Sequence, residues 1–199
     1  MKDMQGLRPL LVYNVTMETE LQLLKAIKSG QRDAQRQLYE RFAGQAMATG
    51  MRYVPDPDQV RDVVHDSFVK ILTSLDQFTY RGEGSLRAWI KSIVAHQAIN
   101  HIKQYEHLKL TDQLPENIAQ ESEEDPDVDR VPPDILNKLI GQLPTGYRIV
   151  LNLYVFEQRS HKEIAHLLGI KPETSASQFS RAKQALAKRI NEYLNNSKL

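Results

Sequence analysis

The chain has 199 residues, 41% of them hydrophobic, which is enough for one or two domains with ordinary helical cores. It contains no cysteine, which excludes disulfide frameworks and thiolate metal sites and fits a reducing cytoplasm. No apolar run approaches the roughly 20 residues of a membrane-spanning helix, and the net charge of +1 hides an acidic segment followed by a basic one.

The first half of the chain is predicted to be helical after an N-terminal tail over residues 1–16, with Met17 as an alternative start. Apolar residues at helical spacing predict helices over residues 18–28, from residue 33 onward, and over 57–75 and 85–107. Asp33 is predicted to cap the second helix, and Asp56 with Pro57 to open the third. No convincing period-two strand pattern occurs, so the predicted fold is all-α.

The helix predicted over residues 85–107 carries hydrogen-bonding and basic side chains at spacings of four, four and three residues. This spacing aligns them on one face: Ser92, His96, Asn100 and Lys103. The loop just before this helix carries Phe78, Tyr80 and Arg81, which can stack on an unpaired base. Loop and helix together predict a reader of single-stranded nucleic acid, and the alternative is a solvated helix face beside a glycine loop.

Residues 110–134 are predicted to form a flexible linker between two domains. Nine acidic residues and one basic residue lie between positions 111 and 134, together with four prolines. From 135 to 199 the balance reverses, with ten lysines or arginines against four acidic residues. A basic domain on an acidic tether suits a polyanionic partner, although charge runs can also be solvated surface.

Two helices are predicted over residues 135–143 and 147–156, and residues 160–183 then show a helix-turn-helix pattern. Ser160 and Glu163 form an S-x-x-E capping box, Gly169 ends the first helix, and Pro172 opens the second. The second helix carries small, polar and basic residues, as DNA-reading helices do; the alternative is a plain helical hairpin. The side chains expected to face DNA are Lys162, Thr174, Ser177, Gln178, Ser180, Arg181 and Lys183.

Three segments resemble, in the right order, the motifs of extracytoplasmic-function (ECF) sigma factors. FTYRGEGSLRAWIKSIVAHQAINHIKQ (78–104) resembles their region two, and VRDVVHDSFVKIL (60–72) is similar to the helix that grips the RNA polymerase clamp. LPTGYRIVLNLYVFEQRSHKEIAHLLGIKPETSASQFSRAKQAL (143–186) resembles region four. The resemblance implies two small helical domains, region two over residues 17–109 and region four over 135–199.

The resemblance also implies a function and its partners. It implies a promoter-specificity subunit that binds core RNA polymerase and promoter DNA in the bacterial cytoplasm, without catalysis or a cofactor, commonly restrained by an anti-sigma factor. Region two would open the −10 element with the loop and helix face described above, and region four would read the −35 element. The residues implied in binding core polymerase are Asp62, His65, Asp66, Phe68 and Val69.

The chain departs from the family pattern in all three segments. The affected positions are Arg61, His65 and Asp66 in the clamp helix, His96, Asn100 and Lys103 in the long helix, and Ala176 and Gln178 in the recognition helix. In the long helix the hydrogen-bonding groups are retained, but because the residues differ from the family's, the preferred promoter sequence cannot be transferred from the family.

The sequence also leaves two other classes of function to consider. Asp62 with His65, and Glu163 with His166, have the carboxylate–histidine spacing of a di-metal helical bundle, but the apolar faces offer no further inward glutamates. Neither a metal site nor catalysis is therefore expected. The nearer alternative is a helix-turn-helix transcriptional regulator that does not act as a sigma factor and forms no stoichiometric complex with core polymerase.

Overall fold

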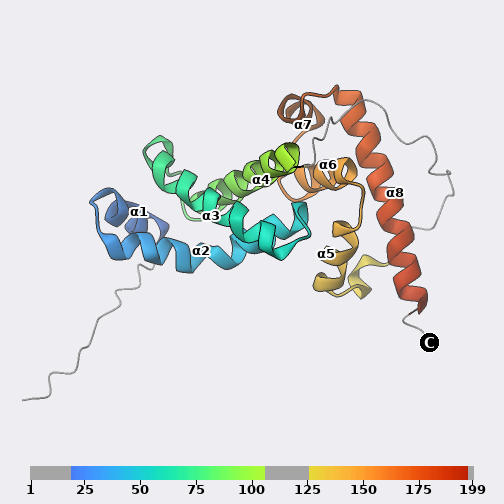
Figure 1. The fold of residues 1–199 in the computed structure, drawn as a ribbon, viewed down its shortest axis with the longest axis horizontal. Coiled ribbons are helices and arrows are strands. Elements are labelled where there is room, and N and C mark those ends of the chain that lie inside the picture. The colour runs from blue at the N-terminus through green and yellow to red at the C-terminus, as the bar shows by residue number, and fades with distance from the viewer. Residues whose placement is uncertain (1–18, 106–125, 197–199) are drawn as a thin grey trace, which may run out of the picture.

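The structure, a computed structural model, describes residues 19–105 and 126–196, and within them every regular element is helical (Figure 1). The predicted tail over residues 1–16 and the linker residues 110–125 lie outside the described residues. In the first half, the elements are α1 (Glu20–Lys28), α2 (Arg32–Tyr53), α3 (Pro57–Ser74), the short 3-10 helix η1 (Leu75–Gln77) and α4 (Ser85–Tyr105). In the second half, they are η2 (Val128–Arg130), α5 (Pro133–Gly141), α6 (Thr145–Val155), α7 (His161–Leu168) and α8 (Pro172–Asn196).

Local sequence signals set most of the helix starts. The Asp56 carboxylate accepts hydrogen bonds from the backbone N–H groups of Asp58 and Gln59 at 2.8 and 3.2 Å, which confirms the predicted start of α3. The prediction for α2 was wrong, because this helix begins at Arg32 and Asp33 lies inside its first turn. The α5 helix begins at Pro133, two residues earlier than predicted, since proline at the first helical position needs no hydrogen-bond partner.

The core of the first half lies where α2, α3 and α4 pack against one another, with α1 across α2. Its apolar side chains are almost completely buried, among them Leu38, Phe42, Val60, Ile71 and Ile90. A second, smaller cluster joins α5, α6 and α8 through Ile140, Leu143, Tyr147, Leu151 and Ala182. Both clusters confirm the all-α architecture predicted from the periodicity.

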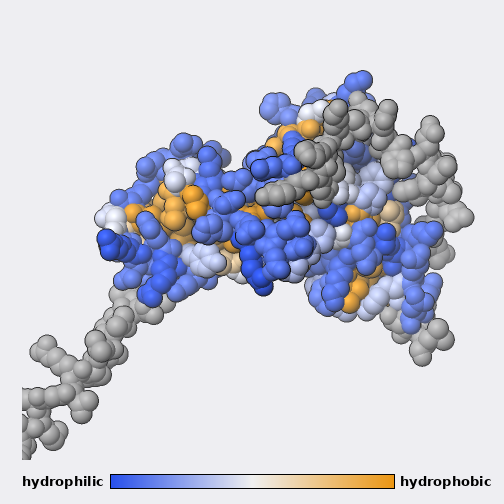
Figure 2. Space-filling model, viewed as in Figure 1, coloured by the Kyte–Doolittle hydropathy of each residue, from blue (hydrophilic) through white to orange (hydrophobic). Residues whose placement is uncertain are grey.

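The two halves pack directly against each other. Side chains of α6 and α7 (Ile149, Val150, Leu153, Ile164 and Leu168) belong to the same buried cluster as those of α2, α3 and α4. Figure 1 shows α6 and α7 beside the end of α4, with the long α8 helix along the outer edge. The surface is largely hydrophilic in the same view, with apolar patches at the α1–α3 end and near α7 (Figure 2). No helix in the two described ranges is both long and apolar enough to cross a membrane.

Candidate nucleic-acid interface

The loop between η1 and α4 forms one wall of a surface hollow. The rings of Phe78 and Trp89 lie 4.9 Å apart, centroid to centroid, and Phe78 also packs on the core. The hollow has a volume of about 430 Å³, within the range of small-ligand sites. Its lining combines the two aromatic rings with the guanidinium of Arg81 and contains no carboxylate: Gln77, Phe78, Thr79, Arg81, Ser85, Ala88 and Trp89. An aromatic wall beside a cation can hold an unpaired base and its phosphate.

Two glutamates fix this loop to α1 by capping each other's helices. The buried Glu20 carboxylate accepts backbone hydrogen bonds from Gly84, Leu86 and Arg87 at 2.9, 2.9 and 3.2 Å, at the start of α4. In return, Glu83 accepts a hydrogen bond from the Glu20 backbone N–H at 3.1 Å. These carboxylates satisfy N–H groups that have no partner within their helices, so the hollow stands on a rigid frame.

Glu83 also organises the polar side of the loop. It forms an ion pair with Arg41 at 3.3 Å and accepts a hydrogen bond from the Tyr80 hydroxyl at 3.2 Å. Desolvation, and then the hydrogen bond to Glu83, raise the pKa of Tyr80 above its usual value. The structure thus brings Phe78 and Arg81 together at the hollow, whereas Tyr80 turns to Glu83.

The polar face predicted on α4 is partly covered by the second half of the chain. Arg159 donates a hydrogen bond to the Ser92 hydroxyl at 3.3 Å, and the Lys103 ammonium donates to the Leu167 carbonyl at 3.3 Å. His96 is half-buried between them, and Asn100 remains exposed. Burial, and then the charge of Arg159, lower the pKa of His96 below its usual value. In this arrangement Ser92, His96 and Lys103 are therefore only partly open to solvent.

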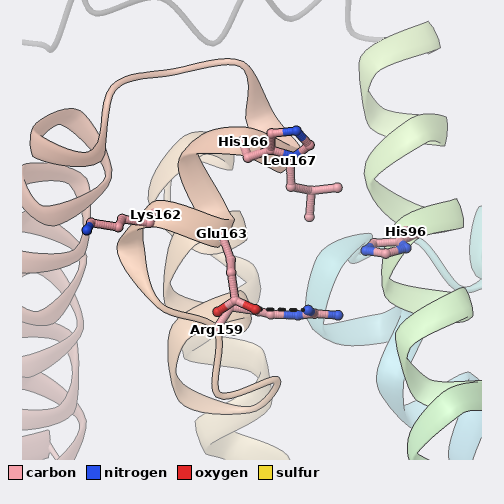
Figure 3. Close-up of a pocket in the computed structure, with 6 residues that line it drawn as sticks. All are labelled: His96, Arg159, Lys162, Glu163, His166 and Leu167. Carbon is pink, nitrogen blue, oxygen red and sulfur yellow. Dashed lines mark hydrogen bonds and ion pairs between the residues drawn. The ribbon is translucent and has the colours of Figure 1, made fainter.

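A second hollow, of about 450 Å³, lies between α4 and α7. In Figure 3, His96 projects from α4 toward α7, where Arg159 pairs with Glu163. His166 and Leu167 face the same space, and Lys162 also lines the hollow, although its side chain extends away from α4. One side of α7 thus contacts α4, and the side that carries Lys162 stays free of that contact.

The α3 helix presents an exposed acidic and apolar surface. Asp62, His65 and Asp66 are exposed, and Val69 is 51% exposed. Phe68 is instead 5% exposed and packs in the core, where its ring lies 4.8 Å from that of Tyr39. Phe68 therefore lies beneath this surface and supports it rather than forming part of it. Tyr39 of α2 is half-exposed and does form part of the surface, a contribution that the sequence analysis did not predict.

The helix-turn-helix geometry is confirmed at both ends of α7. Glu163 and Ser160 form the predicted capping box, with the Ser160 N–H donating to the Glu163 carboxylate at 2.8 Å. These hydrogen bonds lower the pKa of Glu163. Gly169 then ends α7 in the left-handed region, with φ of 74°, a conformation that glycine adopts without strain.

The recognition helix α8 is oriented by a layer of side chains at its N-terminal end. His161 shares a hydrogen bond of 3.0 Å with the buried Ser175 hydroxyl. Tyr154 lies between His161 and Phe179, at centroid distances of 4.7 and 4.2 Å. The sequence analysis did not predict this layer. The only available signal was an aromatic residue, Tyr154, near the end of α6 and a histidine, His161, at the start of α7.

The structure exposes most of the side chains predicted to face DNA. Lys162, Ser177, Ser180 and Lys183 are exposed, and Thr174 and Arg181 are half-exposed. The prediction for Gln178 was wrong, because this side chain is only 4% exposed. With Ser175 and Ala182 it forms the inner stripe of α8, three and four residues apart, so it cannot enter a groove.

Two family models match the chain. The model described as Sigma-70 region 2 matches residues 38–107, and Sigma-70, region 4 matches residues 134–186; together they span more than half of the chain.

Curated relatives resemble it over most of their length. The RNA polymerase sigma-H factor of Pseudomonas aeruginosa is 25% identical over 191 residues, which cover 90% of this chain and 98% of the relative. The ECF RNA polymerase sigma-E factor of Escherichia coli K12 is 24% identical over 191 residues, covering 86% of this chain and 94% of the relative. The solved structure of CnrH in complex with the cytosolic domain of CnrY shares 24% identity over 85% of this chain and 96% of that chain, with a TM-score of 0.45.

Proposed function

Because the chain belongs to the ECF type of sigma-70 factors, the promoter-specificity subunits of bacterial RNA polymerase, we propose specific roles for its surfaces in promoter recognition. The hollow beside Phe78 captures an unpaired base of the −10 element, and α8 reads the −35 element. The α3 surface binds core polymerase in the cytoplasm. An anti-sigma factor is a further expected partner of a protein of this type.

The observation that carries the proposal is the lining of the hollow. Two aromatic rings and one guanidinium converge there without a carboxylate that would repel phosphate. The hollow lies at the start of α4, so a strand leaving it can continue along the face that carries Ser92, His96 and Asn100. Stacking of one base on an aromatic side chain contributes about 1–3 kcal/mol, enough to hold a base that has left the duplex.

Reading of the −35 element rests on the exposed side of α8 and α7. Arg181 can make a bidentate contact with guanine, a contact worth about 1–3 kcal/mol of discrimination. Lys162 and Lys183 are exposed cations suited to phosphate, which positions the domain without reading sequence. Since Gln178 is buried, sequence reading falls to Arg181 and to the hydroxyl groups of Thr174, Ser177 and Ser180.

Arg81→Ala tests the role of the hollow, because this side chain is exposed and its loss leaves the core intact. We expect slower open-complex formation on a duplex promoter and a much smaller defect on a promoter with a pre-melted −10 element. Arg36→Ala, which removes an exposed arginine with only weak ion pairs on α2, is the matched control. Equal defects on both templates, or none on either, would refute the assignment.

A further inference from the structure

The side of α8 that packs on the rest of region four is largely polar at its N-terminal end. The buried stripe there consists of Ser175, Gln178 and Ala182, so its only apolar side chain is one methyl group. Phe179, beside the stripe, is only partly buried. Apolar burial has no preferred direction, and here it is small, so the rotation of α8 about its own axis depends on polar contacts.

A hydrogen bond between α7 and α8 supplies the direction that apolar burial lacks. The Ser175 hydroxyl is fully buried and lies 3.0 Å from Nδ1 of His161. The oxygen of the Gln178 amide makes no such contact, because it is buried without a hydrogen-bond partner in the described parts of the chain. Since a hydrogen bond weakens when its distance or angle changes, the bond from Ser175 to His161 favours one rotation of α8.

The imidazole of His161 is held in place by contacts other than Ser175. It is stacked on the ring of Tyr154, with centroids 4.7 Å apart and an angle of 19° between the ring planes. His161 is also the first residue of α7, directly after Ser160, whose capping box with Glu163 fixes the start of that helix. Ring stacking and helix cap together make the imidazole an anchored partner for α8.

Ser175 points away from the side chains that the proposed function assigns to reading the −35 element. At about 100° per residue, those side chains lie roughly 100° to 160° around the helix axis from Ser175: Thr174, Ser177, Ser180 and Arg181. A rotation of α8 would therefore move all of them relative to the DNA groove together. A bidentate contact such as the one assigned to Arg181 needs both donors within hydrogen-bond distance of one base, so rotation would change base discrimination.

We propose that His161 is a positioning residue for −35 recognition, whose hydrogen bond with Ser175 sets the rotation of α8 and thereby the bases that its outer side chains reach. This inference rests on the proposed reading of the −35 element by α8. Sequence preference at this element is then determined in part by a histidine that acts through Ser175 and touches no base.

Two substitutions of His161 separate the hydrogen bond from ring stacking. His161→Asn places an amide, which can donate or accept, near the position of Nδ1 but removes the ring. His161→Phe keeps a ring against Tyr154 but offers Ser175 no hydrogen-bonding group. Ser175→Ala removes the same bond from the side of α8 and leaves both rings in place. His166→Phe, the same change at an exposed histidine of α7, is the matched control.

The assay is transcription with core polymerase from a promoter active with the natural protein and from its single-base variants across the −35 element. We expect His161→Phe and Ser175→Ala to reduce discrimination at one or more positions by at least about fivefold, the lower end of what a bidentate contact provides. His161→Asn and His166→Phe should retain the natural profile. The double variant His161→Phe, Ser175→Ala should lose no more than either single variant, because both remove one bond.

The possible results separate this inference from a purely structural role and from the function it rests on. Unchanged profiles for His161→Phe and Ser175→Ala would overturn the inference, and so would an equal loss of transcription from every template. Equal loss of discrimination in His161→Asn and His161→Phe would assign the effect to stacking and also overturn it. Thermal denaturation checks each fold, and Ser175→Ala decides the question if His161→Phe does not fold at the assay temperature. Absence of any −35 preference in the natural protein would instead overturn the proposed function.

Discussion

Glu20→Ala should destabilise the protein strongly, although the residue lies in the first turn of a short N-terminal helix. Its buried carboxylate accepts three backbone hydrogen bonds at the start of α4, and alanine would leave these N–H groups without that acceptor. A hydrogen bond to a charged group is worth about 1.5–3 kcal/mol, and loss of a helix N-cap costs about 0.5–2 kcal/mol. Because the three bonds share one carboxylate and are not additive, we expect a loss of about 3 kcal/mol in the free energy of unfolding.

Urea denaturation followed by circular dichroism measures this change in the free energy of unfolding. Thermal denaturation should show a matching fall in melting temperature of roughly 6–12 °C for a chain of this size. Glu20→Gln retains an oxygen for Gly84 and Leu86 but sets an amide against Arg87, so its loss should be about half as large. Glu40→Ala removes an exposed carboxylate of α2 and should change stability by less than about 0.5 kcal/mol. If Glu20→Ala is as stable as Glu40→Ala, the reciprocal capping of α1 and α4 does not hold this loop.

Further substitutions test the other surfaces. Asp66→Arg should reduce capture of core polymerase in a pull-down while the melting temperature stays nearly unchanged, because Asp66 is exposed; unchanged capture would contradict the α3 assignment. Lys162→Ala should weaken binding evenly across promoter sequences and reduce the salt slope by roughly one unit, whereas Lys188→Ala, on the distal part of α8, should not. Burial, followed by a neighbouring guanidinium, lowers the pKa of His96, so its contribution to stability is complete above about pH 6.5 and declines as the pH falls through the lower folded-state pKa. Urea denaturation between pH 5 and 7.5 should show this decline for the natural protein and a weaker one for His96→Gln; identical profiles would exclude the histidine as its source.

Short-range sequence signals correctly predicted the helix starts and turns that depend on neighbouring residues. The Asp56–Pro57 start of α3, the Ser160–Glu163 capping box and the Gly169 turn each depend on residues within four positions of one another. The helix-turn-helix could therefore be located from sequence. Gln178 was misplaced because a polar side chain was assumed to face outward, although its spacing to Ala182 put it on the inner stripe of α8.

Contacts between distant residues could not be predicted in this way. Glu20 caps α4 across more than sixty positions, and Arg148 reaches the Tyr53 carbonyl across 95. In the sequence, Glu20 is an ordinary acidic residue in the first turn of a helix, and Arg148 is a single basic residue in an apolar helix. Nothing in the periodicity of either helix indicates a backbone partner on another helix, so the docking of the two domains emerged only from the structure.

In vitro transcription with bacterial core RNA polymerase tests the central claim most directly. Core enzyme would be assayed on a library of genomic fragments with and without this protein, and the complex measured by size-exclusion chromatography. We predict a one-to-one complex with core polymerase and new start sites that depend on the protein and share upstream elements near −10 and −35. Absence of protein-dependent start sites, with DNA binding that needs no polymerase, would contradict the account and favour a helix-turn-helix regulator of another kind.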